Sequence, residues 1–579
     1  CRMAPRRGSL SFALLVCVAL DRTTALEVSA LWQDQTEEFL DRCVPAEDFP
    51  KEIAGSLYFA GPSLWSLGGQ EVRHAFDGLG RLHKLYYDAP RRQLCHSARF
   101  ILGPGNAGVL KSCDLTRAGN FARVKGAAWW TKLPLLQLLV SNLDNTWVNQ
   151  LYFPTAHLPG GEERLELMTD SSPVLLAETD SLDIKRVIHW NDTLVQSILP
   201  VAPLSTAHPS VHPVSGDVYN IFLDAGLLSN DVVLFRRSGA EPERRQEVAR
   251  IPVGRDMLLQ HSFALSAEYA ILFAHPFSVD LAKVATGADL LDAMGEWGDQ
   301  QNFTRLLVVD LAPERYGRVQ ELRVAPFTVV HVANAYRDGD ALVLDVEGRP
   351  MRPGKTTAFY KIFQYEFAKD PAAGSRYFEE QFVRGGYGLY RFVVPLSPGT
   401  AVNAMGELPS PRKLLDEPLA FPTIAPQVAG KAHCFIWGVL GDTFEQIEAG
   451  LVKVDVCSGG AVPLRWGLPG HAIAAAIAFV PRAAEVSEDA GWLLVPLHHQ
   501  VPGGRSLLAV INAQTMTQVS LVPLKQGDVL NWSAHSTFVA AAPQQPRGDA
   551  AVAPTEVAIT TVRDAIQRCA ALASGTVEF

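Results

Sequence analysis

Four histidines share one setting, each at the edge of a short β-type run: His208, His261, His331 and His535. Imidazole nitrogens are common ligands of transition metals, so four converging histidines would form a metal centre without thiolate ligands. A single histidine is far more often structural than a ligand, and the HExxH motif of zinc proteases does not occur in this chain. The shared setting is what distinguishes these four among the 15 histidines.

The other histidines are interpreted as structural. His212 lies four residues after His208, a spacing that would pair the two side chains on a helix. A turn and a strand follow His208 instead, which argues against that pairing. The same structural interpretation is given to His74, His83, His96, His157, His189, His275, His433, His471, His498 and His499.

The elements that must position the four histidines are short strands. Helical periodicity is confined to a few places, such as Thr36–Cys43 and Val562–Leu572. Between about residues 55 and 540, β-type runs instead end at clusters of Gly, Asp, Asn and Pro, as in Asp217–Asp224, Tyr269–Ala274 and Ala341–Val346. Many short strands without alternating helices indicate an all-β fold, and the length favours a seven-bladed β-propeller with blades of about 70 residues.

The spacing of the histidines fits such a propeller. Successive members of the set are separated by about one blade, one blade and three blades of that size. Side chains at those intervals would converge most naturally on the axis of a closed, radially repeated fold. The sequence therefore predicts an axial metal site.

Composition excludes some functions. The chain of 579 residues carries a net charge of −10, and no basic cluster indicates a nucleic-acid partner. The eight cysteines are scattered and contain no CxxC pair, so a zinc knuckle is not expected. Their spacing assigns no disulfide, and free buried thiols are the expectation for a chain of this size.

The two ends are predicted to lie outside the propeller. Residues 1–26 contain arginines, a short apolar run and small residues, the pattern of a secretory signal or targeting segment. This pattern predicts entry into the secretory pathway, with a secreted, lumenal or plastid destination. The propeller is assigned to residues 27–540, and residues 541–579 read as an Ala- and Pro-rich linker with a short C-terminal helix.

Several ordered motifs resemble those of the carotenoid cleavage oxygenase family, which includes the retinoid isomerohydrolase of the eye. The four histidine settings match that family in order. Further similarity lies in Gly55–Pro62 (GSLYFAGP), His74–Gly78 (HAFDG), Leu175–Glu178 (LLAE), Glu488–Gly491 (EDAG) and Ile511–Met516 (INAQTM). The resemblance covers about residues 50 to 540 and implies a seven-bladed propeller with a helical cap over the axial metal.

The resemblance also implies a function. Iron(II) would be held by the four histidines, and the protein would use O2 to cleave a conjugated double bond of a carotenoid or apocarotenoid, a lipophilic polyene, to carbonyl products. The alternative within the family is a retinoid-type isomerase or a non-catalytic apocarotenoid-binding protein. A calcium-dependent propeller lactonase is disfavoured, because calcium prefers oxygen ligands.

The chain departs from the family at the glutamates that orient iron-bound histidines. The resemblance assigns the first of these to Glu178, whereas the positions of the second and third hold Ala420 and Ala476. Losing such partners weakens metal binding. Glu417 is a possible substitute for the second, although it would face the other side of a strand. The sequence thus predicts a weakened iron site.

A peripheral contact with membranes is the last expectation. Residues 127–143 (AAWWTKLPLLQLLVSNL) place two tryptophans beside a Leu-rich stretch. Tryptophans at the headgroup level with leucines below them are typical of a monotopic anchor. The alternative is an ordinary buried helix.

Overall fold

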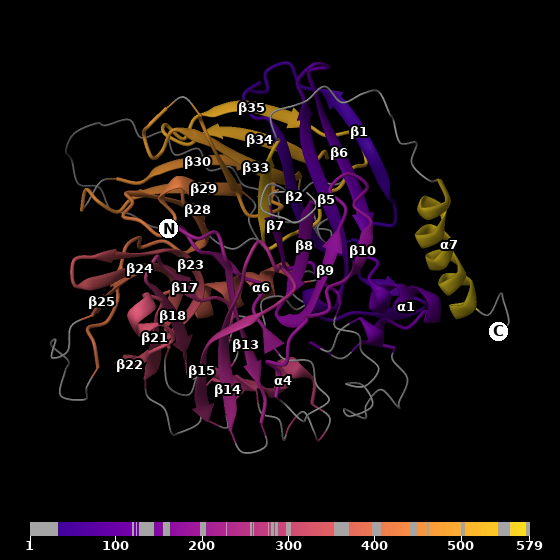
Figure 1. The fold of residues 1–579 in the computed structure, drawn as a ribbon. Helices are drawn as coiled ribbons and strands as arrows, with labels where there is room; N and C mark the ends of the chain where they lie inside the picture. The colour runs from indigo at the N-terminus through magenta and orange to yellow at the C-terminus, as the bar shows by residue number, and fades with distance from the viewer. Residues whose placement is uncertain are drawn as a thin grey trace, which may run out of the picture.

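The computed structural model describes residues 33–541 and 556–574, apart from short internal segments of which 127–143, 352–369 and 397–406 are the longest. Seven antiparallel sheets of four or five strands follow one another along the chain. They are arranged as a seven-bladed propeller, which confirms the predicted all-β fold (Figure 1). The helical cap stays a prediction. The proposed signal, the Trp-Leu segment and the linker lie outside the described residues.

The first blade joins both ends of the propeller. Its strands run in the order β1 (Phe39–Pro45), β6 (Gln93–Phe100), β5 (Leu79–Asp88), β2 (Gly55–Leu64) and β36 (Ser536–Ala540). The strand β36 pairs antiparallel with β2, so the last strand closes the ring on the first blade. At this seam a Cβ atom on Gly61 would lie 1.7 Å from the carbonyl oxygen of Trp532, so only glycine permits the close approach.

The second to fourth blades follow in chain order. The second contains β7 (Asn149–Phe153), β8 (Arg164–Thr169), β9 (Ser171–Ala177) and β10 (Ile184–Val187). The third contains β11 (Leu204–Ser205), β12 (Ser210–Val211), β13 (Val218–Asp224), β14 (Asn230–Arg237) and β15 (Gln246–Gly254). The fourth contains β17 (Ala264–Leu265), β18 (Tyr269–Ala274), β21 (Thr304–Asp310) and β22 (Val319–Val324).

The remaining three blades complete the ring. The fifth contains β23 (Phe327–Asp338), β24 (Ala341–Pro350), β25 (Gly388–Pro395) and β26 (Arg412–Lys413). The sixth contains β27 (Leu419–Thr423), β28 (Phe435–Leu440), β29 (Glu448–Asp455) and β30 (Leu464–Pro469). The seventh contains β31 (His471–Ile473), β32 (Ala478–Pro481), β33 (Gly491–His499), β34 (Leu507–Asn512) and β35 (Gln518–Pro523).

The core lies between neighbouring blades. Central strands such as β13 and β18 are buried along their whole length, because both of their faces pack against another blade. This explains why β18 is apolar throughout and β13 is apolar apart from Asn220 and Asp224, instead of alternating between apolar and polar residues. Shorter strands pair outside the blades, namely β3 (Ser66–Leu67) with β4 (Gln70–Glu71), and β19 (Phe277–Val279) with β16 (Met257–Leu258) and β20 (Met294–Glu296).

Helices are few among the described residues. The α-helices are α1 (Pro104–Ser112), α4 (Leu290–Ala293), α6 (Pro371–Phe378) and α7 (Glu556–Ala573), and the π-helical turn η8 (Glu379–Val383) follows α6. The helix predicted over Thr36–Cys43 was wrong, because Phe39–Pro45 forms the strand β1, which pairs with β6 in the first blade. Within the described residues, no helix is long and apolar enough to cross a bilayer.

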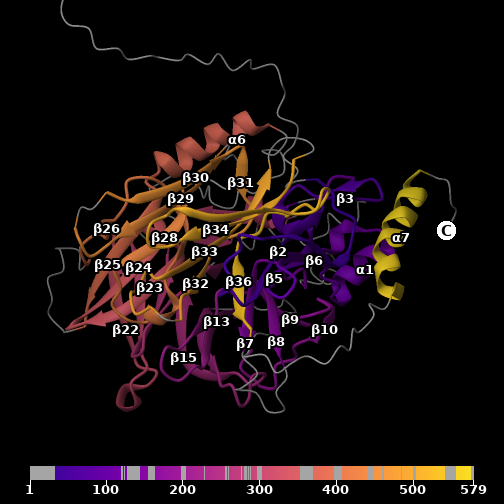
Figure 2. The ribbon, with the colours of Figure 1, turned by 90° about the horizontal axis from the view of Figure 1, so that it is seen from above.

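All six described cysteines form disulfides, so the expectation of free thiols was wrong. The pairs are Cys43–Cys95, Cys113–Cys569 and Cys434–Cys457. Cys43 and Cys95 are directly opposite each other in the pairing of β1 with β6, a proximity that strand topology creates and sequence spacing does not reveal. The disulfide from Cys569 fastens α7 beside α1 at the edge of the propeller (Figures 1 and 2).

Candidate metal centre

The four predicted histidines meet at the axis, and each comes from the innermost strand region of a different blade. His208 lies between β11 and β12, His261 precedes β17, His331 is in β23, and His535 precedes β36. One ring nitrogen from each can be chosen so that all four lie within 4.8 Å of one another. The Nε2 atoms of His208 and His261 are 3.0 Å apart. The blades that supply them are the third, fourth, fifth and first, which is the spacing that the sequence predicted.

Burial makes these imidazoles suitable for a cation. Desolvation holds the pKa of His208, His331 and His535 well below the ordinary value, and repulsion between the histidines lowers each pKa further. The rings are therefore neutral at physiological pH, with lone pairs available for a metal. The Nε2 atoms of His331 and His535 are buried and have no hydrogen-bond partner among the described residues. A bound cation would satisfy both atoms, so the donor set fits a transition metal.

Asp170 orients the second histidine. It lies in the turn between β8 and β9, and its Oδ2 accepts a hydrogen bond of 2.7 Å from Nδ1 of His261. Its Oδ1 accepts a bond of 2.9 Å from the backbone N–H of Ala207, next to His208. The structure does not place Glu178 in this role. Glu178 forms an ion pair of 3.0 Å with Lys185, and its side chain is 44% exposed.

Glu347 orients the third histidine. Antiparallel pairing places it in β24 directly across from His331 in β23, and its Oε2 accepts a bond of 2.7 Å from His331 Nδ1. The same oxygen accepts a bond of 2.8 Å from the backbone N–H of Phe421, and Tyr387 Oη donates to Oε1. Desolvation raises the pKa of Glu347 to about 8, although the Phe421 N–H opposes the shift.

The expected loss of a carboxylate beside this histidine was therefore wrong. Position 420 in the sixth blade is alanine, but Glu347 in β24, the strand next to that of His331 in the fifth blade, bonds to His331 instead. The substitute considered from the sequence does not serve, because Glu417 pairs with Arg465 at 2.8 Å on the surface.

The other two histidines have no such partner. Among the described residues, no carboxylate is hydrogen-bonded to the ring of His208 or His535. Hydroxyl groups fix their backbone instead: Thr206 Oγ1 accepts a bond of 3.0 Å from the His208 N–H and donates to the carbonyl of His261. Ser533 Oγ donates to the carbonyl of His535 at 2.7 Å. Ala476 lies close by, since its carbonyl accepts a bond of 2.6 Å from Ser536 Oγ.

Phe421 forms an apolar wall of the site. Its ring centroid lies 5.4 Å from that of His331 and 5.6 Å from that of His535. The residue has φ = 53°, a left-handed conformation that is strained for a phenylalanine. That conformation accompanies the bond from its N–H to Glu347, so the backbone that orients the carboxylate also presents the ring to the metal site.

The remaining described histidines stay outside the metal site. His212 Nε2 bonds to the carbonyl oxygen of Ala267 at 3.0 Å, as expected for a structural residue. His74 caps a short turn by accepting from the Phe76 N–H, and Asp77 of the same motif accepts from the N–H groups of Phe121 and Ala122. The HAFDG motif therefore has a structural role here.

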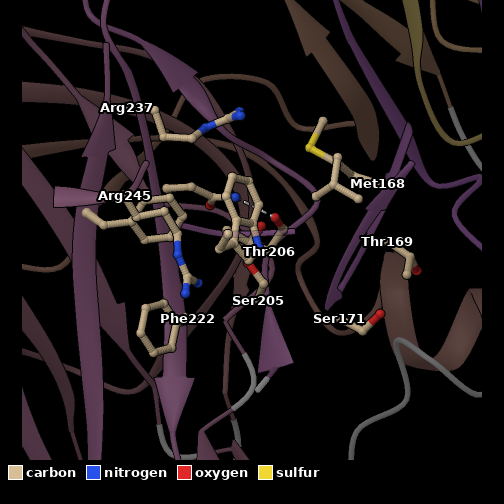
Figure 3. Close-up of a pocket in the computed structure, with 12 residues that line it drawn as sticks. Met168, Thr169, Ser171, Ser205, Thr206, Phe222, Arg237 and Arg245 are labelled. Atoms are coloured by element: carbon tan, nitrogen blue, oxygen red, sulfur yellow. Dashed lines mark hydrogen bonds between the residues drawn. The ribbon is translucent and has the colours of Figure 1, made fainter. Parts of the chain in front are cut away.

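A separate pocket lies between the second and third blades (Figure 3). Its volume of about 10 Å³ is room for one water molecule and not for a polyene. Arg237 and Arg245 in its wall are each paired with a carboxylate, from Glu166 and Asp192 respectively. Thr169 and Ser171, which flank Asp170 in the sequence, line the pocket, so the pocket lies close to the residue that orients His261.

Comparison with known proteins agrees with this fold. Residues 32–540 match the model of the Retinal pigment epithelial membrane protein family, so the chain belongs to this family, that of the carotenoid cleavage oxygenases. The helix α7 lies beyond the matched region.

Curated relatives cover most of the chain at low identity. The apocarotenoid-15,15'-oxygenase of Synechocystis is 23% identical over 499 residues, which are 84% of this chain and 91% of the relative. The carotenoid 9,10(9',10')-cleavage dioxygenase 1 of Arabidopsis thaliana is 22% identical and covers 88% of each chain. A solved structure of a Synechocystis apocarotenoid oxygenase variant superposes with a TM-score of 0.69 at 19% identity, over 88% of this chain and 98% of the other.

Proposed function

We propose that this protein is an iron(II)-dependent dioxygenase that cleaves a conjugated double bond of a carotenoid or apocarotenoid to carbonyl products. The observation that carries the proposal is the convergence of four histidine imidazoles, one from each of four blades, with their donor nitrogens within 4.8 Å. Imidazole suits Fe(II), and oxygenase names among the relatives support dioxygen and a polyene as substrates. Iron(II) bound there would supply the activation of dioxygen.

The chain's own residues would hold the metal and shape its surroundings. The four histidines bind, while Asp170 and Glu347 keep two of the rings in the correct tautomer and orientation. Phe421 covers part of the site with an apolar ring, which excludes water and offers a surface for a polyene. No side chain needs to act as a general acid or base in this proposal.

The test is product analysis with iron-loaded protein. Incubation with a panel of carotenoids and apocarotenoids under 18O2 should give labelled aldehydes or ketones by mass spectrometry. His331→Ala should give none, whereas the matched control His212→Ala should keep the activity because His212 lies outside the site. Isomerised or merely bound polyene without scission would contradict the dioxygenase and support the isomerase or binding alternative.

We also propose that the chain matures in an oxidising compartment, as expected for entry into the secretory pathway. The three disulfides support this, because such bonds are rare in reducing compartments. Protein isolated with its thiols blocked should show six cysteines protected from a maleimide reagent until reduction. Free thiols at those positions would contradict the proposal.

Peripheral binding to membranes is proposed on the sequence of residues 127–143. Replacing Leu135, Leu136, Leu138 and Leu139 by Ser should release the protein from liposomes while its thermal unfolding stays cooperative. The control replaces Val462 and Leu464, two apolar side chains that are exposed elsewhere on the described surface, by Ser. Equal liposome binding before and after the change would contradict the anchor.

A further inference from the structure

Glu347 is a buried carboxylate without a cationic side chain as partner. Its side chain is 1% exposed, and no Lys or Arg of the described residues forms an ion pair with it. Its contacts are His331 Nδ1, the Phe421 N–H and the Tyr387 hydroxyl. Ionising a buried carboxyl group that lacks a counter-charge is costly, so a cation nearby would be needed to stabilise the charged form of Glu347.

The nearest place for that cation is the four-histidine cluster. His331 stands between Glu347 on its Nδ1 side and the converging ring nitrogens on its Nε2 side. Asp170 stands in the same relation to His261. Four neutral imidazoles, two carboxylates and one divalent cation would form an assembly without net charge, which can be buried at low cost.

The carboxylate of Glu347 lies next to position 420. The residue that bonds to it through the backbone is Phe421, directly after Ala420, the position at which the sequence resemblance expects a glutamate. The carboxylate group of Glu347 therefore lies beside the backbone of β27 in the sixth blade, although Glu347 itself belongs to β24 of the fifth blade.

From these contacts we infer that Glu347 is a positioning residue that replaces a glutamate at position 420: its carboxylate orients His331 and supplies one of the two negative charges that balance the metal. This inference rests on the proposed function, because it requires a divalent metal at the histidines. The site then keeps its full affinity for the metal, because a carboxylate from a different strand supplies the same negative charge.

The closing experiment measures Fe(II) affinity by anaerobic competition with a chelator. Glu347→Gln keeps the size and one acceptor for the Phe421 N–H but removes the charge, and should bind Fe(II) about 10- to 100-fold more weakly. The double variant Glu347→Ala with Ala420→Glu should recover affinity to within a few fold of wild type. The EPR spectrum of the nitric oxide complex should change in Glu347→Gln and return in the double variant.

The matched control is Asp345→Asn. Asp345 is a buried carboxylate on the same strand, but it pairs with Arg391 and His433 and does not contact a metal-site histidine. It should lose stability without losing Fe(II) affinity. Wild-type affinity in Glu347→Gln would overturn the inference alone, and failure of the double variant would overturn the exchange with position 420. A wild-type protein that binds no iron would refute the proposed function as well.

Discussion

The metal centre has two unlike sides. On one side, His261 and His331 each donate to a carboxylate, from Asp170 and Glu347. On the other side, His208 and His535 are fixed through backbone bonds to the hydroxyl groups of Thr206 and Ser533. The charged side supplies negative charge and sets ring orientation, whereas the neutral side only places the backbone. Ligand identity alone therefore does not describe the centre.

The largest difference between the sides should follow from deleting a ligand on each. His331→Ala and His535→Ala should both lower iron content to less than about a tenth of wild type. Only His331→Ala also removes one of the three hydrogen-bond donors of the buried Glu347, which costs about 1–3 kcal/mol. Metal analysis and denaturant unfolding of the metal-free proteins measure the two effects. Equal unfolding free energies for the two variants would show that the hydrogen bond to Glu347 does not distinguish the two sides.

Removing a carboxylate should have the next largest effect. Asp170→Asn is expected to weaken Fe(II) binding about 10- to 100-fold, because His261 loses a carboxylate acceptor while the residue keeps its size. Chelator competition measures the loss. The matched control Glu178→Gln should leave affinity unchanged, since Glu178 pairs with Lys185. A weaker site in Glu178→Gln would restore the role that the sequence first assigned to it.

Adding a carboxylate should affect the two sides of the centre differently. Ala476→Glu introduces a charge near His535 on the neutral side and should tighten Fe(II) binding several-fold, by about 1 kcal/mol. Ala420→Glu introduces a second carboxylate beside Glu347 on the charged side, where repulsion between like charges should prevent any gain. Titration with a chelator distinguishes them. Tighter binding in Ala420→Glu with Glu347 intact would show that the charged side is not yet complete.

The smallest expected effect concerns a hydroxyl. Thr206→Val removes the group that bonds to the backbone of both His208 and His261 and should cost about 1–2 kcal/mol of unfolding free energy. Fe(II) affinity should fall only a few fold, because no ring loses its partner. Thr169→Val, a nearby change in the pocket wall, serves as the control. A loss of iron as large as that in Asp170→Asn would place Thr206 among the groups that hold the rings.

The sequence predicted the fold and the convergence of the four histidines at the axis. The blade-sized spacing of the histidines survives in the structure, because each histidine lies in or beside the innermost strand region of its blade and the sheets follow chain order. The β-type run at Asp217–Asp224 also coincides with a buried strand, β13.

The carboxylates could not be predicted in the same way. Asp170 reaches from a turn in the second blade to a ligand that leads into the fourth, so no local spacing connects them. Glu347 faces His331 because of register, yet β23 contains two irregularities against β24, between Val329 and His331 and between Val332 and Asn334. Since Asp345 and Glu347 share a face of β24, the sequence could not tell which of them would meet the ligand.

The closure of the ring determines when during synthesis the metal site can form. His535 directly precedes β36, and β36 is placed only when it pairs with β2 near the other end of the chain. A nascent chain on the ribosome therefore has three of the imidazoles long before the fourth can join them. Because domains form as units once their last strand is available, iron should be captured after translation of the propeller ends, and a chain truncated before His535 should emerge as an open ring that cannot retain metal.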